Sequence, residues 1–582
     1  MDMPVEPILL ENSDAILEDI EHHFKVVAGP GAGKTRWLCN HVRNVLSKSE
    51  RLNKCRKIAC ITYTNVGVDA IIKRLGDSID KVEVSTIHSF LYKHIVKPYI
   101  FLIKDEFGLD PAKIDGHDEL IPSGGLIYEW MKKTNQLYPD YIDEINKLIK
   151  ALCDLCWKFS DDNEELELKF RHIWSNNVGK YPIKRDSLIT YKKIFWERNL
   201  LHHDDVLYFS FTLMKRYPDI LRVIRCKFPY FFIDEFQDTN PIQTEIIKML
   251  AEKETIVGVI GDKAQSIYVF QGADVKQFDE FELPNIITYK IENNHRSTEE
   301  ILAVLNFIRA DITQHNPDNK RGQKPSIFIG SALDSFKKAK QLVESDNVCT
   351  LSYANVTSCE MKNEYVGIGG DDLLLNLLSV DSSERGKIVA ALIKGIEYAK
   401  QNKFKDAIKQ VSRYFKETDE FKGHKTALKI IHAMLANYNS YVNGSLFDFY
   451  TALTAIELIK ITKINTSRIT AIRTFYEETT YKEIVLWVKY NDDDSLHRTI
   501  HKAKGDEFDN VLVIIKDKNN LEFDERKKLS FLLTPNLENV DQRVYYVALS
   551  RAKERLFVNI PTLSPENRTK LEEIGFNVEI LE

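Results

Sequence analysis

Two adjacent carboxylates, Asp234 and Glu235, directly follow an apolar run at 230–233 that is typical of a buried strand. Pro229 stands just before the run, where a strand tolerates proline. In phosphoryl-transfer sites, one such carboxylate holds a magnesium ion and the next orients or deprotonates the attacking water. Because an isolated Asp-Glu pair is more often a charged turn, this interpretation needs support from elsewhere in the chain.

A glycine-rich turn between a predicted strand at 24–28 and a predicted helix supplies that support. Its small residues let backbone N–H groups surround a triphosphate at the positive end of the helix. Lys34 would reach the β and γ phosphates, and Thr35 would bind magnesium together with Asp234. A turn that only caps a helix does not explain Lys and Thr at this offset. The predicted phosphate-binding residues are Ala28, Gly29, Pro30, Gly31, Ala32, Gly33, Lys34 and Thr35.

Composition limits the possible classes of protein. The chain has 582 residues, 43% hydrophobic and 29% charged, which predicts a globular protein of several domains. No apolar run is long enough to cross a bilayer, and residues 1–11 lack the pattern of a secretory signal, so we expect a cytoplasmic location. The formal net charge is −6, so binding of nucleic acid would require a local basic groove.

The cysteines favour neither a disulfide scaffold nor a metal centre. Eight cysteines are few for so long a chain. Cys153 and Cys156 form one CxxC pair within 149–159, a segment that we predict to be helical. With no second Cys or His pair nearby, we interpret both as core thiols.

Strands alternate with helices along most of the chain, which predicts an α/β fold with parallel sheets. Further strands are expected at 57–62, 255–260, 286–290, 510–515 and 555–560, and a helix at 66–75. Two stretches, 92–204 and 361–482, are mostly helical in pattern, with examples at 385–402 and 422–439. We interpret both stretches as insertions into α/β domains.

Several motifs, in a fixed order through the chain, resemble those of superfamily 1A helicases of the UvrD/Rep type. Besides the phosphate loop and the Asp-Glu motif, they lie at 61–65, 86–90, 261–273, 294–297, 499–508 and 546–552. The resemblance implies an ATP-dependent DNA helicase with ATP and Mg²⁺ as cofactors. It also implies two RecA-like domains: 1A at 1–91 and 205–290, interrupted by insertion 1B at 92–204, and 2A at 291–360 and 483–582, interrupted by insertion 2B at 361–482.

The same resemblance assigns roles to single residues. The implied catalytic residues are Lys34, Asp234, Glu235, Gln265, which senses the γ-phosphate, and the arginines Arg296 and Arg551. His295 and Glu507 join the phosphate loop as implied ATP contacts. The implied DNA-binding residues are Tyr63, Thr64, Asn65, Thr86, His88, Tyr268, Phe270 and His501.

Physical arguments are consistent with these roles but leave alternatives open. Arg296 and Arg551 lie far from Lys34 in sequence, and we expect them in the second α/β unit, from which arginines would stabilise the transferring phosphoryl group. Aromatic residues such as Tyr268 are more often core residues than base-stacking platforms. His88 is equally consistent with a surface histidine.

The chain departs from the family pattern at four points. No Gln occurs before Gln136, so the N-terminal Gln that reads adenine in the family is not found. Gln271 replaces an Arg, His295 replaces a Tyr, and Asp506 replaces an apolar residue. We expect these changes to weaken or retune ATP turnover.

Our main hypothesis is a 3′–5′ DNA helicase or translocase that couples ATP hydrolysis to movement on single-stranded DNA. The alternative is a DNA-sensing regulatory ATPase that activates a partner nuclease. It is motivated by the departures at Gln271 and His295 and by a short insertion between Arg296 and His501. With the short tail after Arg551, this compactness resembles the helicase-like subunit of Gabija-type antiphage systems, which partner an OLD-family nuclease. A phosphate-loop ATPase that is not a helicase is the third possibility.

Overall fold

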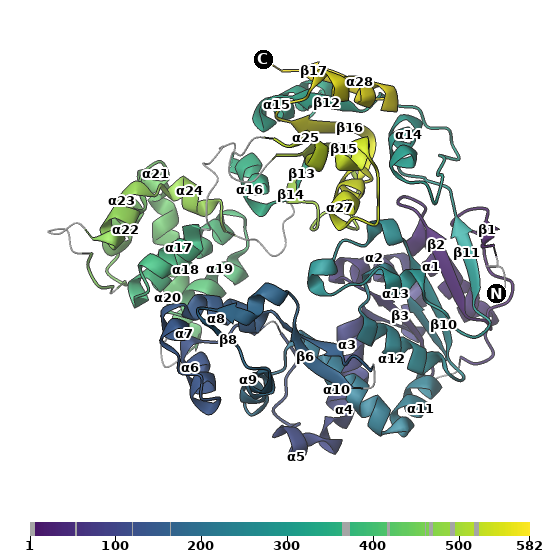
Figure 1. The fold of residues 1–582 in the computed structure, drawn as a ribbon, viewed down its shortest axis with the longest axis horizontal. Helices are drawn as coiled ribbons and strands as arrows, with labels where there is room; N and C mark the ends of the chain where they lie inside the picture. The colour runs from purple at the N-terminus through teal and green to yellow at the C-terminus, as the bar shows by residue number, and fades with distance from the viewer. Residues whose placement is uncertain are drawn as a thin grey trace. The chain divides into compact units, whose positions relative to one another are not determined.

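The computed structural model describes residues 6–52, 55–118, 120–162, 165–363, 373–415, 420–459, 461–464, 470–488, 495–516 and 523–581 (Figure 1). The chain divides into two compact units. The first unit contains Met1–Gly322 and Pro535–Ser550, and the second contains Gln323–Thr534 and Arg551–Glu582. Each unit is built around its own parallel sheet, which confirms the predicted α/β class.

The sheet of the first unit has seven strands in the order β1-β11-β2-β10-β9-β3-β4, all parallel. Its strands are β1 (Ile8–Leu10), β2 (Phe24–Ala28), β3 (Ile58–Thr62), β4 (Val82–Thr86), β9 (Tyr230–Ile233), β10 (Ile256–Gly261) and β11 (Ile287–Ile291). All four residues of β9 are buried, as expected for a central strand covered on both faces. The strands predicted at 24–28 and 230–233 are therefore confirmed. The strand predicted at 57–62 begins one residue later, and those predicted at 255–260 and 286–290 are shifted by one residue.

Helices cover both faces of this sheet (Figure 1). On one face, α1 and α2 pack through Trp37, Val42 and Ile71 against strand residues such as Val26 and Phe232. On the other face, residues of α3, α10, α11 and α12 pack against Phe231 and its neighbours. These helices are α1 (Lys34–Lys48), α2 (Asn65–Leu75), α3 (Ile87–Leu91), α10 (His203–Arg216), α11 (Pro218–Lys227) and α12 (Pro241–Ala251).

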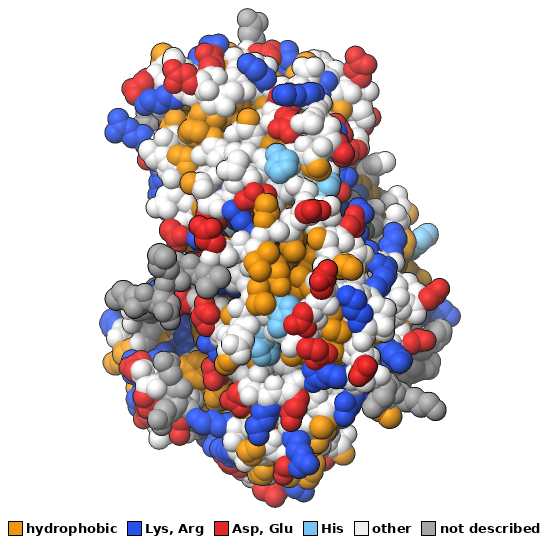
Figure 2. Space-filling model, turned by 90° about the vertical axis from the view of Figure 1, so that its right-hand side faces the viewer, with side chains coloured by type: hydrophobic (Ala, Val, Ile, Leu, Met, Phe, Trp, Pro, Cys, Tyr) orange, Lys and Arg blue, Asp and Glu red, His pale blue; other side chains and the backbone are white. Residues whose placement is uncertain are grey.

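The edge of this sheet at β1 exposes hydrophobic side chains. Ile8, Leu9 and Ile16 are each more than half exposed. Figure 2 views the side of the molecule on which β1 lies in Figure 1, and hydrophobic side chains gather near the centre of that face. β1 is hydrogen-bonded to β11 along one side and ends the sheet on the other.

The stretch from Tyr92 to the start of α10 is less uniformly helical than predicted. It contains α4 (Lys97–Tyr99), α5 (Lys104–Phe107), α6 (Gly124–Lys133), α7 (Pro139–Asp143), α8 (Ile145–Cys153) and α9 (Leu188–Trp196). It also contains two antiparallel pairs, β5 (Leu155–Phe159) with β6 (Leu166–Phe170) and β7 (Asn177–Val178) with β8 (Tyr181–Pro182). Part of this stretch packs in a separate core that includes Trp130, Leu148 and Tyr191.

The helix predicted at 149–159 is wrong in its second half. α8 ends at Cys153, and Leu155 begins a strand whose register places it opposite Phe170. The cause is tertiary, because a short apolar run such as 155–157 becomes a strand when a partner strand lies beside it. Cys156 is buried, as predicted, whereas Cys153 is exposed. Within the described residues, no group of His, Cys, Asp and Glu side chains is arranged to hold a metal ion.

The second unit has a six-stranded parallel sheet in the order β14-β13-β15-β16-β12-β17. Its strands are β12 (Ser326–Ile329), β13 (Cys349–Ser352), β14 (His497–Thr499), β15 (Phe508–Ile514), β16 (Ala552–Ile560) and β17 (Asn577–Ile580). The helices that flank these strands in sequence are α15 (Ala332–Val343), α16 (Asn355–Asn363), α25 (Glu525–Lys528), α26 (Ser530–Leu533) and α28 (Pro565–Ile574).

The described residues between 373 and 488 form a helical body with a hydrophobic core of its own. That core includes Leu392, Ile430, Phe449 and Tyr481 and contains no residue of the sheet. Its helices are α17 (Leu373–Val380), α18 (Glu384–Lys400), α19 (Phe404–Ser412), α20 (Glu420–Ala436), α21 (Tyr438–Tyr441), α22 (Leu446–Thr454), α23 (Ala471–Glu478) and α24 (Tyr481–Val485). Among the helices described in either unit, none is both long and apolar enough to cross a bilayer.

Candidate nucleotide and DNA site

Most of the predicted site residues of the first unit follow the carboxyl ends of its strands. The phosphate loop follows β2, the Asp-Glu motif follows β9, and Asp262 follows β10. Tyr63 follows β3, the strand next to β9. In open parallel sheets this edge is where ligands bind, so the topology gathers the predicted residues at one end of the sheet.

The phosphate loop has a backbone that requires glycine. Gly31 and Gly33 have φ angles of 70° and 81°, in the left-handed region that other residues rarely adopt. A β-carbon on Gly31 would lie 2.6 Å from Oδ1 of Asn294, and one on Gly33 would lie 2.8 Å from Cβ of Ser13. The loop is therefore a close-packed cradle of small residues, which suits a bound phosphate chain.

Lys34 and Thr35 begin α1 at the end of this loop. The Lys34 ammonium donates to the backbone oxygens of Ala28 and Gly29, at 3.3 and 3.5 Å, so it lies over the loop. The Thr35 hydroxyl donates to Oδ2 of Asp234 at 2.8 Å. One hydroxyl and one carboxylate thus converge on a single point, which is the donor set of oxygen atoms that Mg²⁺ prefers.

Asp234 is almost fully buried. Burial, and secondarily the negative charge of Glu235, raise the pKa of Asp234 above its ordinary value, while the Thr35 hydroxyl and the Lys34 ammonium oppose that rise. A carboxylate held in so unfavourable a setting is stabilised by a cation, because the charge of a bound ion favours its ionised form.

Glu235 has a strained backbone. Its φ of 57° and ψ of 39° place it in the left-handed region, which costs a residue with a side chain about 1–3 kcal/mol. Its carboxylate accepts a hydrogen bond from the Gln237 amide. The oxygen of that amide accepts from the backbone N–H of Asp262 at 3.0 Å. Glu235 is therefore both strained and connected, through the Gln237 side chain, to Asp262 at the end of β10.

Gln265 lies at the end of that path. Its amide nitrogen donates to Oδ2 of Asp262 at 2.6 Å, and the side chain is buried. Glu235, Gln237, Asp262 and Gln265 thus form one connected network within the first unit. The sequence predicted the first and last of these residues as catalytic, and the structure connects them through the other two.

Arg296 and His295 lie against the phosphate loop, within the first unit rather than the second. The His295 N–H donates to the Gly31 oxygen at 3.0 Å, and the guanidinium of Arg296 donates to the backbone oxygen of Ser550 at 2.9 Å. This differs from the expectation that Arg296 belongs to the second α/β unit. The reason is the Asn294 amide, which donates to the Pro30 oxygen at 2.7 Å and fixes this segment to the loop.

Arg551, Glu507 and His501 belong to the second unit. Arg551 is buried, and its guanidinium donates to the Asp506 backbone oxygen at 3.2 Å. The Asp506 carboxylate accepts a hydrogen bond from Arg498 at 2.6 Å. The negative charge that Asp506 places where the family has an apolar residue is therefore paired. Glu507 pairs with Lys553 at 2.9 Å, and the ring of His501 packs edge-on against Tyr353.

Three aromatic residues form a column in the first unit. Tyr63 and Tyr268 are stacked, with ring centroids 5.1 Å apart and an interplanar angle of 22°. Phe270 lies beside Tyr268 at 6.0 Å and is nearly half exposed. The Tyr63 hydroxyl donates to the Gln271 side chain at 2.7 Å. Tyr63 and Tyr268 thus pack on each other, and Phe270 presents ring surface to solvent.

Arg171 places a cation beside this column. It directly follows β6, and its guanidinium donates to the Phe270 backbone oxygen at 3.1 Å. A second guanidinium nitrogen lies 3.5 Å from Asp204 on α10. Position 271 is Gln where the family pattern has Arg, but Arg171 brings a guanidinium to the same place from another element. No local sequence pattern indicates this, because Arg171 lies 99 residues from Phe270.

The remaining predicted DNA residues of the first unit have local structural roles. Thr64 caps α2 by accepting from the Gly67 N–H, and Thr86 caps α3 by accepting from the Ser89 N–H. Asn65 is the first residue of α2. N-capping accounts for both threonines without any ligand.

His88 lies among other histidines. Its ring centroid is 5.8 Å from that of His203 and 6.3 Å from that of His117. Nδ1 of His117 and Nδ1 of His203 are 2.6 Å apart. Burial lowers the pKa of His88 to about 3 and that of His117 to about 4, with the neighbouring histidines adding to both shifts. His88 is therefore a packed, neutral residue at pH 7 rather than a free surface histidine.

Comparisons with known proteins agree with this arrangement. Residues 10–285 match the UvrD/REP helicase N-terminal domain, and residues 334–561 match the UvrD-like helicase C-terminal domain. The chain belongs to the UvrD-type helicase family. The two matches leave out most of β1, all of β17, and the segment 286–333, which carries β11, β12, His295 and Arg296.

The chain is also similar to several bacterial helicases. The chain is similar to the ATP-dependent DNA helicase PcrA of Bacillus subtilis (strain 168), with 28% identity over 320 residues, 52% of this chain and 40% of that protein. PcrA of Staphylococcus epidermidis (strain RP62A) is 27% identical over 349 residues, 58% of this chain and 44% of that protein. The chain thus spans less than half the length of these relatives.

Two contacts at the phosphate loop of this UvrD-type chain were not predicted from the sequence. The Arg36 guanidinium donates to both carboxylate oxygens of Asp14, at 2.8 and 2.6 Å, and joins the N-terminal segment to α1. The buried Gln314 amide donates to the Pro30 oxygen at 3.0 Å, and its side chain lies where a β-carbon on Gly29 would be. Both partners are distant in sequence, so no local pattern indicated them.

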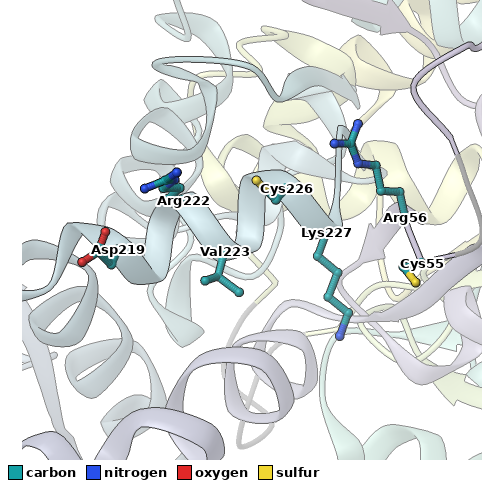
Figure 3. Close-up of a pocket in the computed structure, with 7 residues that line it drawn as sticks. All are labelled: Cys55, Arg56, Asp219, Arg222, Val223, Cys226 and Lys227. Atoms are coloured by element: carbon teal, nitrogen blue, oxygen red, sulfur yellow. The ribbon is translucent and has the colours of Figure 1, made fainter.

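A hollow at the other end of the same sheet is separate from these residues. It has a volume of about 690 Å³. Figure 3 shows its lining residues, which come from α11 and from the segment before β3: Cys55, Arg56, Asp219, Arg222, Val223, Cys226 and Lys227. The backbone N–H of Lys57 donates to the Lys227 oxygen at 2.9 Å, just before β3 and β9 begin. The hollow therefore lies at the amino ends of these strands, opposite the phosphate loop.

Proposed function

We propose that the chain is an ATP-dependent DNA helicase or translocase that hydrolyses ATP with Mg²⁺ and moves 3′ to 5′ along single-stranded DNA. One observation carries the proposal: a short segment after β10 belongs to both parts of the site. At one end of it, Gln265 joins the network of Glu235, and at the other end Tyr268 stacks on Tyr63. A displacement of this segment by nucleotide would therefore move the aromatic column.

The nucleotide part of the site fits a nucleoside triphosphate with magnesium. The left-handed glycines give the loop the tight backbone turn of a phosphate cradle, and Lys34 lies over the loop. Thr35 and Asp234 would hold the ion, which when bound neutralises phosphate charge and polarises the transferred group. These oxygens are already 2.8 Å apart, so no rearrangement is required to bring them to one ion.

Hydrolysis needs a base and cations around the γ-phosphate. We propose that Glu235 accepts the proton of the attacking water and that Gln265 senses the γ-phosphate. Arg296 and Arg551 would neutralise the charge that develops in the transition state. His295 and Glu507 complete the proposed ATP contacts. Arg296 is supported by its place against the phosphate loop through Asn294 and His295.

DNA binding would rest on the aromatic column and its surroundings. The exposed ring of Phe270 offers a stacking surface, and stacking on an aromatic ring contributes roughly 1–3 kcal/mol per base. Tyr63 and Tyr268 would hold that surface in place. Thr64, Asn65, Thr86, His88 and His501 remain proposed DNA contacts. Because the formal net charge is −6, local cations such as Arg171 matter for holding phosphates.

The names of the similar proteins support the proposal of an ATP-dependent DNA helicase. The PcrA proteins of Bacillus and Staphylococcus are named ATP-dependent DNA helicases. Since the chain spans less than half of each, their activity is carried over here as part of the proposal. We also propose the division into domains 1A, 1B, 2A and 2B with the boundaries expected from the sequence, except that the segment carrying Arg296 is grouped with the first unit, and a cytoplasmic location.

The proposal is tested by measuring ATP turnover with and without single-stranded DNA. We expect at least roughly ten-fold stimulation by DNA, because base stacking and ATP chemistry share one segment. Replacing Phe270 by Ala should reduce stimulation while leaving turnover without DNA unchanged. ATP turnover that is indifferent to DNA would instead identify a phosphate-loop ATPase of another kind.

A second candidate is a DNA-sensing regulatory ATPase that activates a partner nuclease, of the OLD family in a Gabija-type antiphage system. It is favoured by Gln271, an uncharged residue whose side chain is occupied by the Tyr63 hydroxyl. Strand displacement on duplexes with a 3′ or a 5′ tail separates the two candidates. Unwinding of the 3′-tailed duplex by the isolated chain supports the helicase. DNA-stimulated ATP hydrolysis without unwinding supports the regulatory subunit.

A further inference from the structure

A buried arginine, Arg309, contacts Asp262, the residue that binds the side chain of the proposed γ-phosphate sensor Gln265. Arg309 follows α14 (Glu299–Ile308) and is 2% exposed. Its guanidinium lies 2.8 Å from Oδ1 and 3.0 Å from Oδ2 of Asp262, which is 0% exposed. The same guanidinium donates to both oxygens of Asp311, at 2.7 and 3.1 Å. Arg309 is therefore the cation that accompanies the fully buried carboxylate of Asp262.

Asp262 in turn positions two residues of the proposed ATP site. Oδ2 accepts from the Gln265 amide at 2.6 Å, and Oδ1 accepts from the Ala264 N–H at 3.1 Å. The Asp262 N–H donates to the Gln237 side chain, which contacts Glu235. A buried carboxylate is held in one orientation at low cost only when it is paired. The orientation of Gln265 thus depends on the charge that Arg309 supplies.

Arg309 also connects this network to α27 (Val540–Leu549). Its guanidinium carbon lies 5.9 Å from the ring centroid of Tyr546. From the same helix, the Arg543 guanidinium donates to the Ser266 backbone oxygen at 2.8 Å. The segment around Gln265 is therefore held at Asp262 and at Ser266 by two arginines that are remote in sequence, all within the first unit.

We propose that Arg309 is a positioning residue for ATP hydrolysis, which acts by fixing Asp262 and through it the Gln265 side chain. The inference rests on the proposed function, because it assumes that Gln265 contacts the γ-phosphate. Nucleotide binding depends on the phosphate loop, to which Arg309 makes no contact among the interactions described. Its removal should therefore affect turnover and not ATP affinity.

The test is steady-state ATP hydrolysis by Arg309→Met in the full chain, with single-stranded DNA present. Methionine keeps much of the side-chain volume and removes the charge. We expect kcat to fall roughly ten-fold or more while KM for ATP changes by less than about three-fold, the pattern of an interaction lost in the transition state. Arg309→Lys, which retains a cation near Asp262, should recover most of kcat.

A matched control separates positioning from general destabilisation. Arg385 is a second buried arginine, whose Nε donates to Asp381 at 2.7 Å in the helical body of the second unit. Arg385→Met removes a similar buried ion pair at a place far from any proposed ATP contact in sequence. We expect it to lower the melting temperature and to leave kcat within about two-fold of the unsubstituted chain.

The outcomes distinguish this inference from the function on which it rests. If the unsubstituted chain shows no ATP turnover that DNA stimulates, the proposed function fails. If it does, and Arg309→Met keeps its kcat, or loses kcat only to the extent that Arg385→Met does, then the positioning role is refuted and the function stands. A ten-fold rise in KM with unchanged kcat would also refute it.

Discussion

At the residue scale, the site is defined by side chains whose positions are costly. Glu235 has a left-handed backbone, and Asp234 carries its carboxylate in a buried setting that raises its pKa. Neither is needed to build the strand that precedes them. Unfavourable conformations and charges persist where the surrounding structure fixes them, and they concentrate at functional sites. The strain at Glu235 and the burial of Asp234 are therefore the features that support the proposed nucleotide chemistry.

The first prediction concerns Glu235. Replacing it with Gln keeps the shape and the hydrogen bond with Gln237 but removes the base. We expect ATP turnover to fall roughly 100-fold or more, since general base catalysis contributes about 10²–10⁴-fold. Binding of a fluorescent ATP analogue should be unchanged. Turnover within a few-fold of the unsubstituted chain would show that another group accepts the proton.

At this scale the sequence indicated only part of the site. Lys34, Thr35, Asp234 and Glu235 were predicted from local patterns, and the structure brings them together. Arg309 was not predicted, because its partner Asp262 lies 47 residues earlier and a single arginine after an apolar helix has no distinctive pattern. Long-range ion pairs of this kind follow from the fold and not from neighbouring residues.

At the element scale, the sheet order decides which motifs meet. β9 and β10 are adjacent, which places the Asp-Glu motif next to the segment that carries Gln265. The antiparallel pair β5–β6 was not predicted, and Arg171 follows it. The consecutive apolar residues at the start of β5 are compatible with a helix in isolation, so the pairing with β6 selects the strand.

Arg171 provides a prediction for this pair of strands. Replacing Arg171 with Ala removes a guanidinium that holds Phe270 and lies near the proposed path of DNA. We expect about ten-fold more single-stranded DNA to be needed for half-maximal ATPase stimulation, since hydrogen bonds of charged groups contribute roughly 1.5–3 kcal/mol. Lys169→Ala on the same strand, whose ammonium pairs with Glu167 at 2.6 Å, is the control. If both variants had equal effects, Arg171 would contribute to DNA binding only through the general positive charge of the surface.

The packing of α1 on the sheet gives a prediction about pH. His41 is buried and stacks on Trp37 at 5.2 Å, with Phe24 and Phe232 around it. Burial lowers its pKa to about 3. The unfolded chain therefore binds a proton near pH 6.5 that the folded chain does not, so stability is fully present above pH 6.5 and falls as the pH is lowered towards 3.

Thermal melting between pH 7.5 and 5.5 measures this effect. His41 should cost about 1 kcal/mol of unfolding free energy between pH 6.5 and 5.5. His41→Phe, which keeps an aromatic ring, should make the melting temperature less dependent on pH over this range. An unchanged dependence would mean that other groups, such as His88, account for the loss.

At the scale of the whole molecule, the chain folds as two units around separate sheets, and residues with a proposed role in ATP hydrolysis occur in each of them. Lys34, Asp234 and Arg296 belong to the first unit, and Arg551 and Glu507 belong to the second. The α/β class of both could be predicted from the alternation of strands and helices. The place of Arg296 could not, because the hydrogen bonds of Asn294 and His295 to the phosphate loop assign that segment to the first unit.

If the phosphate loop is the site of DNA-stimulated ATP hydrolysis, Lys34→Ala should abolish that hydrolysis. ATP turnover is measured with saturating single-stranded DNA, beside Arg222→Ala, which removes an exposed cation from the hollow at the other end of the sheet. We predict that Lys34→Ala loses roughly 100-fold or more of the stimulated turnover, because it removes a cation that stabilises the transferring phosphoryl group. Arg222→Ala should retain full turnover. Undiminished DNA-stimulated hydrolysis by Lys34→Ala would show that ATP is not hydrolysed at the phosphate loop.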